Sequence, residues 1–383
     1  MDNLVKPISR LFHPVHLISP GIYHYQAPQS DPRNYRLHLR IEEDGLGVLL
    51  VNAATVLHLN QTAAEYAYYF VQNLSPDQVA GQMSKRYRVD PGKARQDYES
   101  VTGRILTLIE TPDLDPVTFL DFDRQHPYSG KISAPYRLDC AITYRLPEGT
   151  DKEAAPTKHV DRELTTAEWQ SILDKVWQVG VPHIIFTGGE PTLREDLPDL
   201  IAYAESLGQV SGLLTDGLRL ADDAYLELLL QTGLDHLMID FQPDRELAWK
   251  ALENVRLADI FDAVHLTLTP ENAPDMPELL SKLAEKRVQA LSLTTSDAGL
   301  SGDLARLRDL AASLQMELIW DLPVPYSALN PVSLEVQDQK LPEGAGRAWL
   351  YVEPDGDVLP MQGGNRLLGN LLKDPWEKVW QSA

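Results

Sequence analysis

Hydrophobic and polar positions alternate along residues 35–60, with breaks at 45–47 and 52–54. A period of two is typical of strands that bury one face, so this stretch predicts a three-stranded antiparallel meander. Three amphipathic helices are expected after it, and together with the strands they would form a small unit over 20–111. Their predicted N-caps are, in chain order, Asn60, Ser75 and Asp90.

The pattern changes after a segment rich in proline, aspartate and glycine at 112–134, which we interpret as a linker. Short apolar runs then alternate with helical patterns, and such a series specifies a parallel sheet with right-handed crossovers. Six units favour an α/β fold with a partial (β/α)6 TIM-like barrel over 135–325, whose sites would lie at the carboxyl ends of the strands. The predicted strands are 136–144, 183–189, 210–217, 236–242, 263–269 and 290–296, with 318–323 as a candidate seventh.

The last segment, 326–383, predicts a hairpin that turns at Asp355-Gly356, followed by a loop and a short helix after Asp374-Pro375. It is too short to form a domain alone.

Composition narrows the choice of partners. The 383 residues include 56 acidic and 34 basic side chains, and the formal charge of -22 argues against binding to nucleic acid or anionic lipid. The chain shows neither a secretion signal nor an apolar run long enough to span a membrane, so the expected location is cytoplasmic. A single cysteine, Cys140, excludes an intramolecular disulfide and any site built from several thiolates of one chain.

The strongest motif is FTGGEPTL at 186–193, where a predicted strand ends in two glycines and a helix follows. Glycines allow close backbone approach to a ligand, Glu190 can accept hydrogen bonds from an ammonium group, and Pro191 suits a helix start. An ordinary strand-to-helix turn would look similar, but the position after the second strand of the series favours a ligand loop.

With this motif, residues 134–320 resemble the radical S-adenosylmethionine (SAM) superfamily, whose GGEP motif holds the amino group of SAM. The tail, with VEPDGDVLPMQGG and LGNLLKDPWEKVW, is similar to the SPASM or twitch extension of the peptide-modifying members. The unit at 20–111 resembles the peptide chaperone of pyrroloquinoline quinone biosynthesis, which implies a winged-helix-like peptide-recognition domain.

The chain departs from this family where its CxxxCxxC loop should stand. Residues 146–164 contain no cysteine, Cys140 lies too early, and Met361 occupies the place of an extension ligand. Because a radical-type cluster needs three thiolates, we expect no iron-sulfur cluster and no reductive cleavage of SAM. Glu148, Asp151 and His159 are poor ligands for such a cluster, and we expect no metal site.

SAM binding is a separate question, and we expect it to be weak because the chelating iron is missing. The positions that match the family's contacts are Gly188, Gly189, Glu190, Pro191, Thr215, Asp216, Gly217, Asp240 and Thr267, with Gln242 and Thr269 beside them.

The acidic residues in this set also support a different chemistry. Glu190, Asp216 and Asp240, together with Asp321, would crowd one rim of the barrel, where carboxylates can act as general acid and base or bind Mg²⁺. The alternative that we favour is that they are solvated or cap helices, so no catalytic residue is assigned. Three histidines near strand starts are interpreted as structural: His183, His236 and His265.

The N-terminal unit keeps the features that peptide binding needs. A leader peptide could add a strand to the edge of the meander and place apolar side chains beside the third helix. The candidate peptide-binding residues are Val48, Leu50, Val56, Leu57, Tyr87, Tyr98 and Ile105, each of which could instead belong to the core of the unit.

The sequence is therefore interpreted as a catalytically degenerate radical-SAM-like protein that binds a ribosomally made peptide or a partner enzyme as an accessory or scaffold. The alternative is an enzyme that uses SAM without radicals, or a metal with the rim carboxylates. The sequence leaves open the identity of the peptide, the oligomeric state and whether residues 146–164 plug the barrel mouth.

Overall fold

The structure is a computed structural model that describes residues 18–28, 30–111, 114, 116, 132–258, 260–320, 322–332 and 341–383. The chain divides into two compact units, Met1–Ser133 and Ala134–Ala383, and each is treated by itself. Most of the predicted linker at 112–134 lies outside the described residues, as does Asp321.

The first unit contains a four-stranded antiparallel sheet in the order β1-β2-β3-β4. Its strands are β1 (Gly21–Gln26), β2 (Arg36–Ile41), β3 (Gly47–Val51) and β4 (Thr55–Leu59). The three predicted strands are confirmed as β2, β3 and β4, whereas β1 was missed. Tyr23 and Tyr25 of β1 pack on the core from one face of the strand, which is the alternation that could have revealed it.

Three helices follow the sheet: α1 (Gln61–Val71), α2 (Pro76–Tyr87) and α3 (Pro91–Glu110). All three predicted N-caps are confirmed, because the side chains of Asn60, Ser75 and Asp90 accept hydrogen bonds from backbone amides in the first turn. Leu39 and Leu49 of the sheet share a buried core with Ala67 of α1 and Ile105 of α3.

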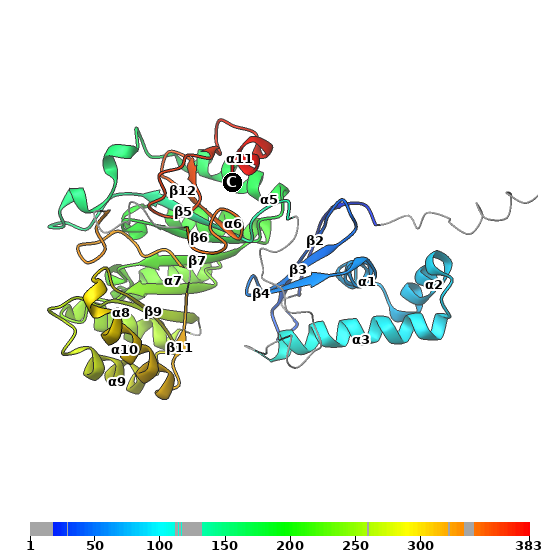
Figure 1. Cartoon of the computed structure of the whole chain (residues 1–383), viewed down its shortest axis with the longest axis horizontal. Coiled ribbons are helices and arrows are strands. Elements are labelled where there is room, and N and C mark those ends of the chain that lie inside the picture. Colours follow the sequence, from blue (N-terminus) through cyan, green and yellow to red (C-terminus); the bar gives the residue numbers. More distant parts are fainter. Residues whose placement is uncertain are drawn as a thin grey trace, which may run out of the picture. The chain divides into compact units, whose positions relative to one another are not determined.

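The second unit is built on a mixed ten-stranded sheet in the order β11-β10-β9-β8-β7-β6-β5-β12-β13-β14, seen in green to orange in Figure 1. The parallel strands are β5 (Arg137–Thr143), β6 (His183–Gly188), β7 (Val210–Thr215), β8 (His236–Asp240), β9 (Phe261–Thr267), β10 (Ala290–Thr294) and β11 (Glu317–Leu318). Each predicted strand is present, and the parallel order follows the chain.

Six helices connect these strands: α5 (Thr166–Gln178), α6 (Leu197–Leu207), α7 (Asp223–Gln231), α8 (Glu246–Leu257), α9 (Met276–Glu285) and α10 (Ser301–Ser313). They pack on one face of the sheet, where Phe186, Ile239 and Trp169 belong to one large core. The opposite face carries a smaller cluster of Ile185, Leu214, Met238, Ala263 and Ala290. This opposite face carries the polar side chains described below.

The C-terminal segment joins the same sheet. Strands β12 (Trp349–Val352) and β13 (Asp357–Leu359) form the predicted hairpin, and β14 (Gly369–Asn370) and α11 (Trp376–Ser382) follow. Strand β12 pairs in parallel with β5, so the tail extends the sheet beyond its first strand. The sequence pattern predicted the hairpin but not this pairing.

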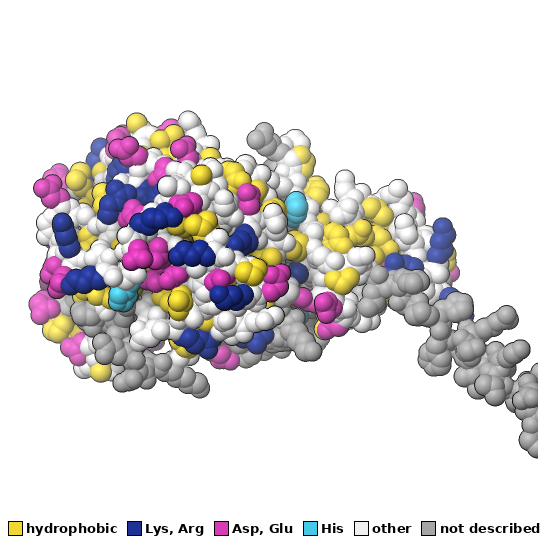
Figure 2. All heavy atoms as spheres, turned by 90° about the horizontal axis from the view of Figure 1, so that it is seen from above, with side chains coloured by type: hydrophobic (Ala, Val, Ile, Leu, Met, Phe, Trp, Pro, Cys, Tyr) yellow, Lys and Arg dark blue, Asp and Glu magenta, His cyan; other side chains and the backbone are white. Residues whose placement is uncertain are grey.

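Within the described ranges, no helix has the length and apolar character needed to cross a membrane. On the face seen in Figure 2, lysine and arginine side chains lie among aspartates and glutamates.

Candidate functional site

A cavity of about 280 Å³ lies at the carboxyl ends of β6, β7 and β8, and we call it the strand-end pocket. Four of the predicted site residues line it: Gly189, Glu190, Asp216 and Asp240. Gln242 also lines it, together with Asp244, Arg245, two residues of the loop after β5 (Pro147 and Thr150) and residues 325–329. The pattern of β-α units thus placed the main acidic residues at one site, as expected for parallel strands.

The two glycines of the motif allow the loop to pack against the chain that leaves β5. A Cβ on Gly188 would lie 2.2 Å from the carbonyl oxygen of Thr143, and one on Gly189 would lie 2.3 Å from that of Arg145. The amides of Gly189 and Glu190 donate to these same two oxygens at 2.8 Å. The glycines therefore serve a backbone-to-backbone contact inside the chain, in addition to any ligand contact.

Glu190 is held by four donors of the chain. One carboxylate oxygen accepts from the amide and hydroxyl of Thr192, at 2.9 and 2.5 Å, and from the hydroxyl of Thr215 at 2.7 Å. The other accepts from the amide of Asp216 at 2.7 Å. Because these bonds join the ends of β6 and β7, Glu190 fixes the floor of the strand-end pocket.

Burial sets the protonation of the acidic residues. It raises the pKa of Glu190 to about 8, with a further contribution from the charge of Asp216. Burial also raises the pKa of Asp240 to about 7 and that of Asp216 above its usual value. A cationic ligand in this pocket would favour the charged forms.

Residues 325–329 form a strap over the strand-end pocket that the sequence pattern did not reveal. The amide of Tyr326 donates to the carbonyl oxygen of Gly188 at 2.8 Å, and the ring of Tyr326 stacks edge-on against Tyr144 at 5.5 Å. Ser327 hydrogen bonds to Asp240. In the sequence, only the prolines at 323 and 325 indicate this segment. They predict irregular structure, but they do not predict which part of the fold it packs against.

His265 does not lie at a strand start, so the predicted position of this residue was wrong. It is the fifth residue of β9 and pairs in register with Asp240 of β8, near the carboxyl ends. Its ring nitrogens contact the hydroxyls of Ser292, Thr267 and Thr294 at 3.0 to 3.2 Å, and burial lowers its pKa to about 3. His183 and His236 do begin β6 and β8, and their Nε2 atoms lie 3.2 Å apart.

The remaining predicted SAM-site residues surround the strand-end pocket without lining it. Pro191 begins a short 3-10 helix, and Gly217 adopts the left-handed conformation after β7. The hydroxyl of Thr215 donates a hydrogen bond to Glu190. Thr267 lines a second cavity instead, beside Phe241 and Trp249.

The candidate peptide-binding residues of the first unit lie on two strands and two helices. Val48 and Leu50 lie on β3, which is paired on both sides and therefore offers no free edge to a peptide. Val56 and Leu57 lie on β4, which ends the sheet within the described residues.

The three candidates on or beside the helices have contacts inside the unit. Tyr98 and Ile105 belong to buried clusters, and the hydroxyl of Tyr87 donates to Glu65 at 2.6 Å.

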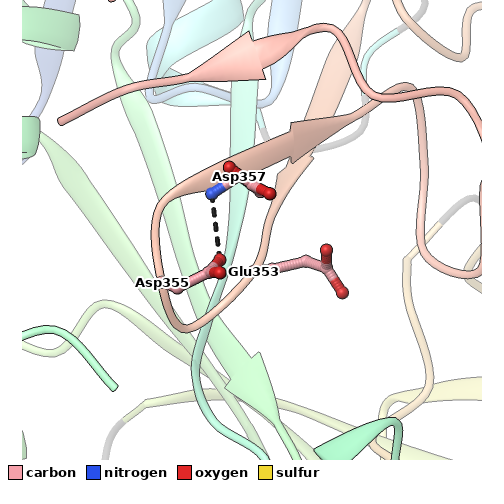
Figure 3. Close-up of side chains that lie close together, drawn as sticks. All are labelled: Glu353, Asp355 and Asp357. Carbon is pink, nitrogen blue, oxygen red and sulfur yellow. Dashed lines mark hydrogen bonds between the residues drawn. The ribbon is translucent and has the colours of Figure 1, made fainter. Parts of the chain in front are cut away.

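A second acidic group lies on the β12–β13 hairpin (Figure 3). Glu353, Asp355 and Asp357 offer oxygens within 4.8 Å of one another, and among the described residues they are the one such group of three. Each already has a partner: Tyr144 donates to Glu353, the amide of Asp357 donates to Asp355, and Asn370 donates to Asp357. Glu148, Asp151 and His159 do not come together.

Parts of this chain are similar in sequence to known proteins. Residues 140–266 match the model of the Radical SAM superfamily. The PqqA peptide cyclase of Granulibacter bethesdensis is 27% identical over 285 residues, which is 66% of this chain and 74% of that protein. The PqqA peptide cyclase of Streptomyces rochei is 27% identical over 282 residues, which is 66% of this chain and 77% of that protein.

Among solved structures, Streptococcus suis SuiB bound to precursor peptide SuiA has a TM-score of 0.57 and 16% identity, and the match covers 93% of this chain and 88% of that one. SuiB bound to S-adenosylmethionine has a TM-score of 0.55 and 14% identity, with the same coverage. These likenesses establish a shared α/β fold.

The donor set of this chain was tested against the cluster of the superfamily. Cys140, the one cysteine of the sequence, is fully buried on the helix face of β5, and burial raises the pKa of its thiol. A single buried thiol does not fit a cluster that is held by three thiolates. No chemical step is therefore derived through such a cluster.

The comparisons nevertheless overturn two expectations from the sequence. The match to the superfamily model and the names of the relatives contradict a catalytically degenerate scaffold, and they point to an active peptide-modifying enzyme. They also contradict the expectation that SAM binds weakly and that no iron-sulfur cluster is used. The chain carries a radical SAM domain and is homologous to the PqqA peptide cyclases.

Proposed function

We propose that this chain is a peptide-modifying enzyme that binds SAM in the strand-end pocket. The observation that carries the proposal is the acidic lining: the carboxyl groups of four residues, Glu190, Asp216, Asp240 and Asp244, line a cavity whose described lining includes one arginine and no lysine. SAM carries an ammonium group and a sulfonium, and buried carboxylates with raised pKa values gain most from such a cation.

The residues have different roles in this proposal. Asp216 and Asp240 line the pocket and would accept hydrogen bonds from the ammonium group of SAM and attract its sulfonium by charge, whereas both oxygens of Glu190 are engaged by the chain. Glu190 is therefore a positioning residue that holds the ends of β6 and β7. Gly188, Gly189, Thr215 and Gly217 would set the backbone around the ligand.

The substrate would be a ribosomally made precursor peptide. The relatives are named for a peptide, PqqA, and SuiB has been solved with its precursor SuiA. We further propose that residues 20–111 form a winged-helix-like peptide-recognition domain, whose edge strand β4 pairs with a leader peptide. Residues 135–325 would form the partial (β/α)6 barrel, and 326–383 the twitch-like extension.

The first test is calorimetric titration of the full-length chain with SAM and with S-adenosylhomocysteine, which has the same amino acid group but no sulfonium charge. We expect SAM to bind at least about tenfold more tightly, a difference of about 1.4 kcal/mol. Asp240→Asn should weaken SAM binding by about tenfold or more, while the matched control Glu353→Gln should leave it within about twofold. Equal binding of the two ligands, or no binding of either, would count against the pocket as a SAM site.

The second test uses PqqA peptide as a probe of substrate class. Incubation with the chain, SAM and a reductant, followed by mass spectrometry, should give a mass change in the peptide that depends on Asp240. An unchanged peptide that also fails to bind in titration would remove PqqA-like peptides from the proposal.

A further inference from the structure

A second cavity, of about 400 Å³, lies beside the first at the ends of β8 and β9, and we call it the Trp249 pocket. Its walls come from four elements and the residues beside them: Phe241 follows β8, Leu266 lies near the end of β9, Trp249 belongs to α8, and Met276 and Leu279 belong to α9. These side chains are apolar, and the volume lies within the range of small-ligand pockets. The cavity is therefore shaped for an apolar group.

The indole at its centre is held in place before any ligand arrives. The Nε1 atom of Trp249 donates to the carbonyl oxygen of Pro243 at 2.8 Å. The ring of Phe241 meets the indole edge to face, with centroids 4.8 Å apart and an angle of 88° between the planes. Because both rings are fixed, an incoming aromatic side chain would find a preformed surface.

The rim of the Trp249 pocket is acidic. Asp244, Asp275 and Glu278 line it, and Lys282 is the one cationic side chain among the described lining residues. The ammonium of Lys282 lies 3.8 Å from the centroid of the Trp249 ring and so is engaged there. Within the described part of the chain, none of the three carboxylates has an ion-pair partner. The rim therefore favours a cation beside the apolar group.

The two cavities have common walls. Asp244 and Leu329 line both the Trp249 pocket and the strand-end pocket. A peptide that places one side chain in the Trp249 pocket would bring its neighbouring residues to the strand-end pocket. The geometry thus links an apolar anchor to the proposed SAM site.

We propose that the Trp249 pocket binds an aromatic side chain of the substrate peptide, with an adjacent lysine or arginine held by the rim carboxylates. This inference rests on the proposed function, because it names a feature of that enzyme's substrate. The acidic rim favours a basic peptide over a nucleoside, whose base and ribose are uncharged at neutral pH.

The test is titration of the full-length chain with three blocked tripeptides, acetyl-Lys-Phe-Lys-amide, acetyl-Lys-Ala-Lys-amide and acetyl-Glu-Phe-Glu-amide. We expect the first to bind at least about tenfold more tightly than either of the others. The second peptide lacks the aromatic ring, and the third carries acidic side chains in place of the two lysines. Equal binding of all three, or no binding, would overturn the proposal.

Substitutions in the lining show whether the Lys-Phe-Lys peptide binds in the Trp249 pocket. Leu279→Trp should fill the pocket and weaken the Lys-Phe-Lys peptide by about tenfold or more, and Asp275→Asn with Glu278→Gln should weaken it by about threefold and reduce its salt dependence. The control is Glu253→Gln, an exposed residue of α8 outside the lining, which should change nothing. Thermal unfolding of each variant verifies that it is folded.

Titration with SAM separates this proposal from the proposed function. If Leu279→Trp weakens SAM and leaves the peptide unchanged, the pocket is a nucleoside site and the inference is wrong. If wild-type chain binds the Lys-Phe-Lys peptide but not SAM, the anchor site stands and the proposed function fails.

Discussion

Two groups of carboxylates lie in the second unit, and they differ in what surrounds them. Around the strand-end pocket, Asp216 and Asp240 line a cavity. On the hairpin, Glu353, Asp355 and Asp357 lie closer to one another, yet their partners come from the chain itself, including Tyr144 and Asn370. Proximity of acidic groups alone therefore does not indicate a ligand site.

The pKa values do not separate the two groups. Burial raises the pKa of Glu353 to about 7, as it does for Asp240. What differs is the space beside the carboxylates, because Asp216 and Asp240 line a cavity. Glu190 differs further, since it accepts four hydrogen bonds from the chain, whereas Glu353 accepts from Tyr144.

The largest expected effect is on stability. Glu190→Ala leaves the amides of Thr192 and Asp216 without an acceptor, and we expect it to lower the free energy of unfolding by about 3 kcal/mol. Glu353→Ala leaves one hydroxyl, that of Tyr144, without its partner and removes repulsion on the hairpin, so we expect a loss of about 1 kcal/mol or less. Urea denaturation of both variants at pH 7 measures the difference, and equal losses would show that the two groups are held alike.

A second prediction concerns pH. Because burial raises the pKa of Asp240 from 3.8 to about 7, the folded state holds this proton more tightly than the unfolded state. The stabilisation is fully present below about pH 4 and is lost as the pH rises through about 7. Asp240→Asn keeps a neutral side chain, so it should be more stable than wild type at pH 8 by about 1 to 3 kcal/mol and equal to it at pH 4.

Glu353→Gln serves as the counterpart on the hairpin. It should also gain stability at pH 8, since the pKa of Glu353 is raised in the same direction. Saturating SAM should reduce the advantage of Asp240→Asn and leave that of Glu353→Gln unchanged. The measurement is thermal unfolding of both variants at pH 4 and pH 8, with and without SAM. An identical response of the two variants to SAM would contradict the conclusion that only the strand-end pocket binds this ligand.

The smallest expected effect lies in the hairpin turn. Gly356 has a φ of +89°, and a Cβ there would lie 3.3 Å from the side chain of Asn370. Gly356→Ala should therefore lower the free energy of unfolding by about 1 kcal/mol without changing SAM affinity. A clear loss of SAM binding in this variant would show that the hairpin supports the pocket.

Much of the fold could be predicted because local patterns repeat along the chain. The β-α series from β5 to β10 and the N-caps at Asn60, Ser75 and Asp90 depend on short-range chemistry, which the sequence displays directly. Strand β1 was missed although Tyr23 and Tyr25 alternate along it, and the pairing of β12 with β5 could not be found from local patterns. The latter depends on contacts between residues far apart in the chain, which leave no periodic signal.

The candidate site shows the same limit. Glu190, Asp216 and Asp240 were identified because parallel strands bring their carboxyl ends together. The strap at 325–329 and the position of His265 within β9 were not identified. An irregular segment carries no periodic pattern that tells where it packs, and an error of two residues in the start of β9 places His265 near the wrong end of this seven-residue strand.

The parallel pairing of β12 with β5 also constrains how the protein is made. Strand β5 exposes one unpaired edge until β12 emerges from the ribosome, roughly 200 residues later in synthesis. Such an edge can pair with other nascent chains, and the charged residues of the strand, Arg137 and Asp139, already form an ion pair with each other. Truncation before Trp349 would therefore leave the sheet open at its first strand, and we expect fragments of that length to aggregate rather than to accumulate as a folded domain.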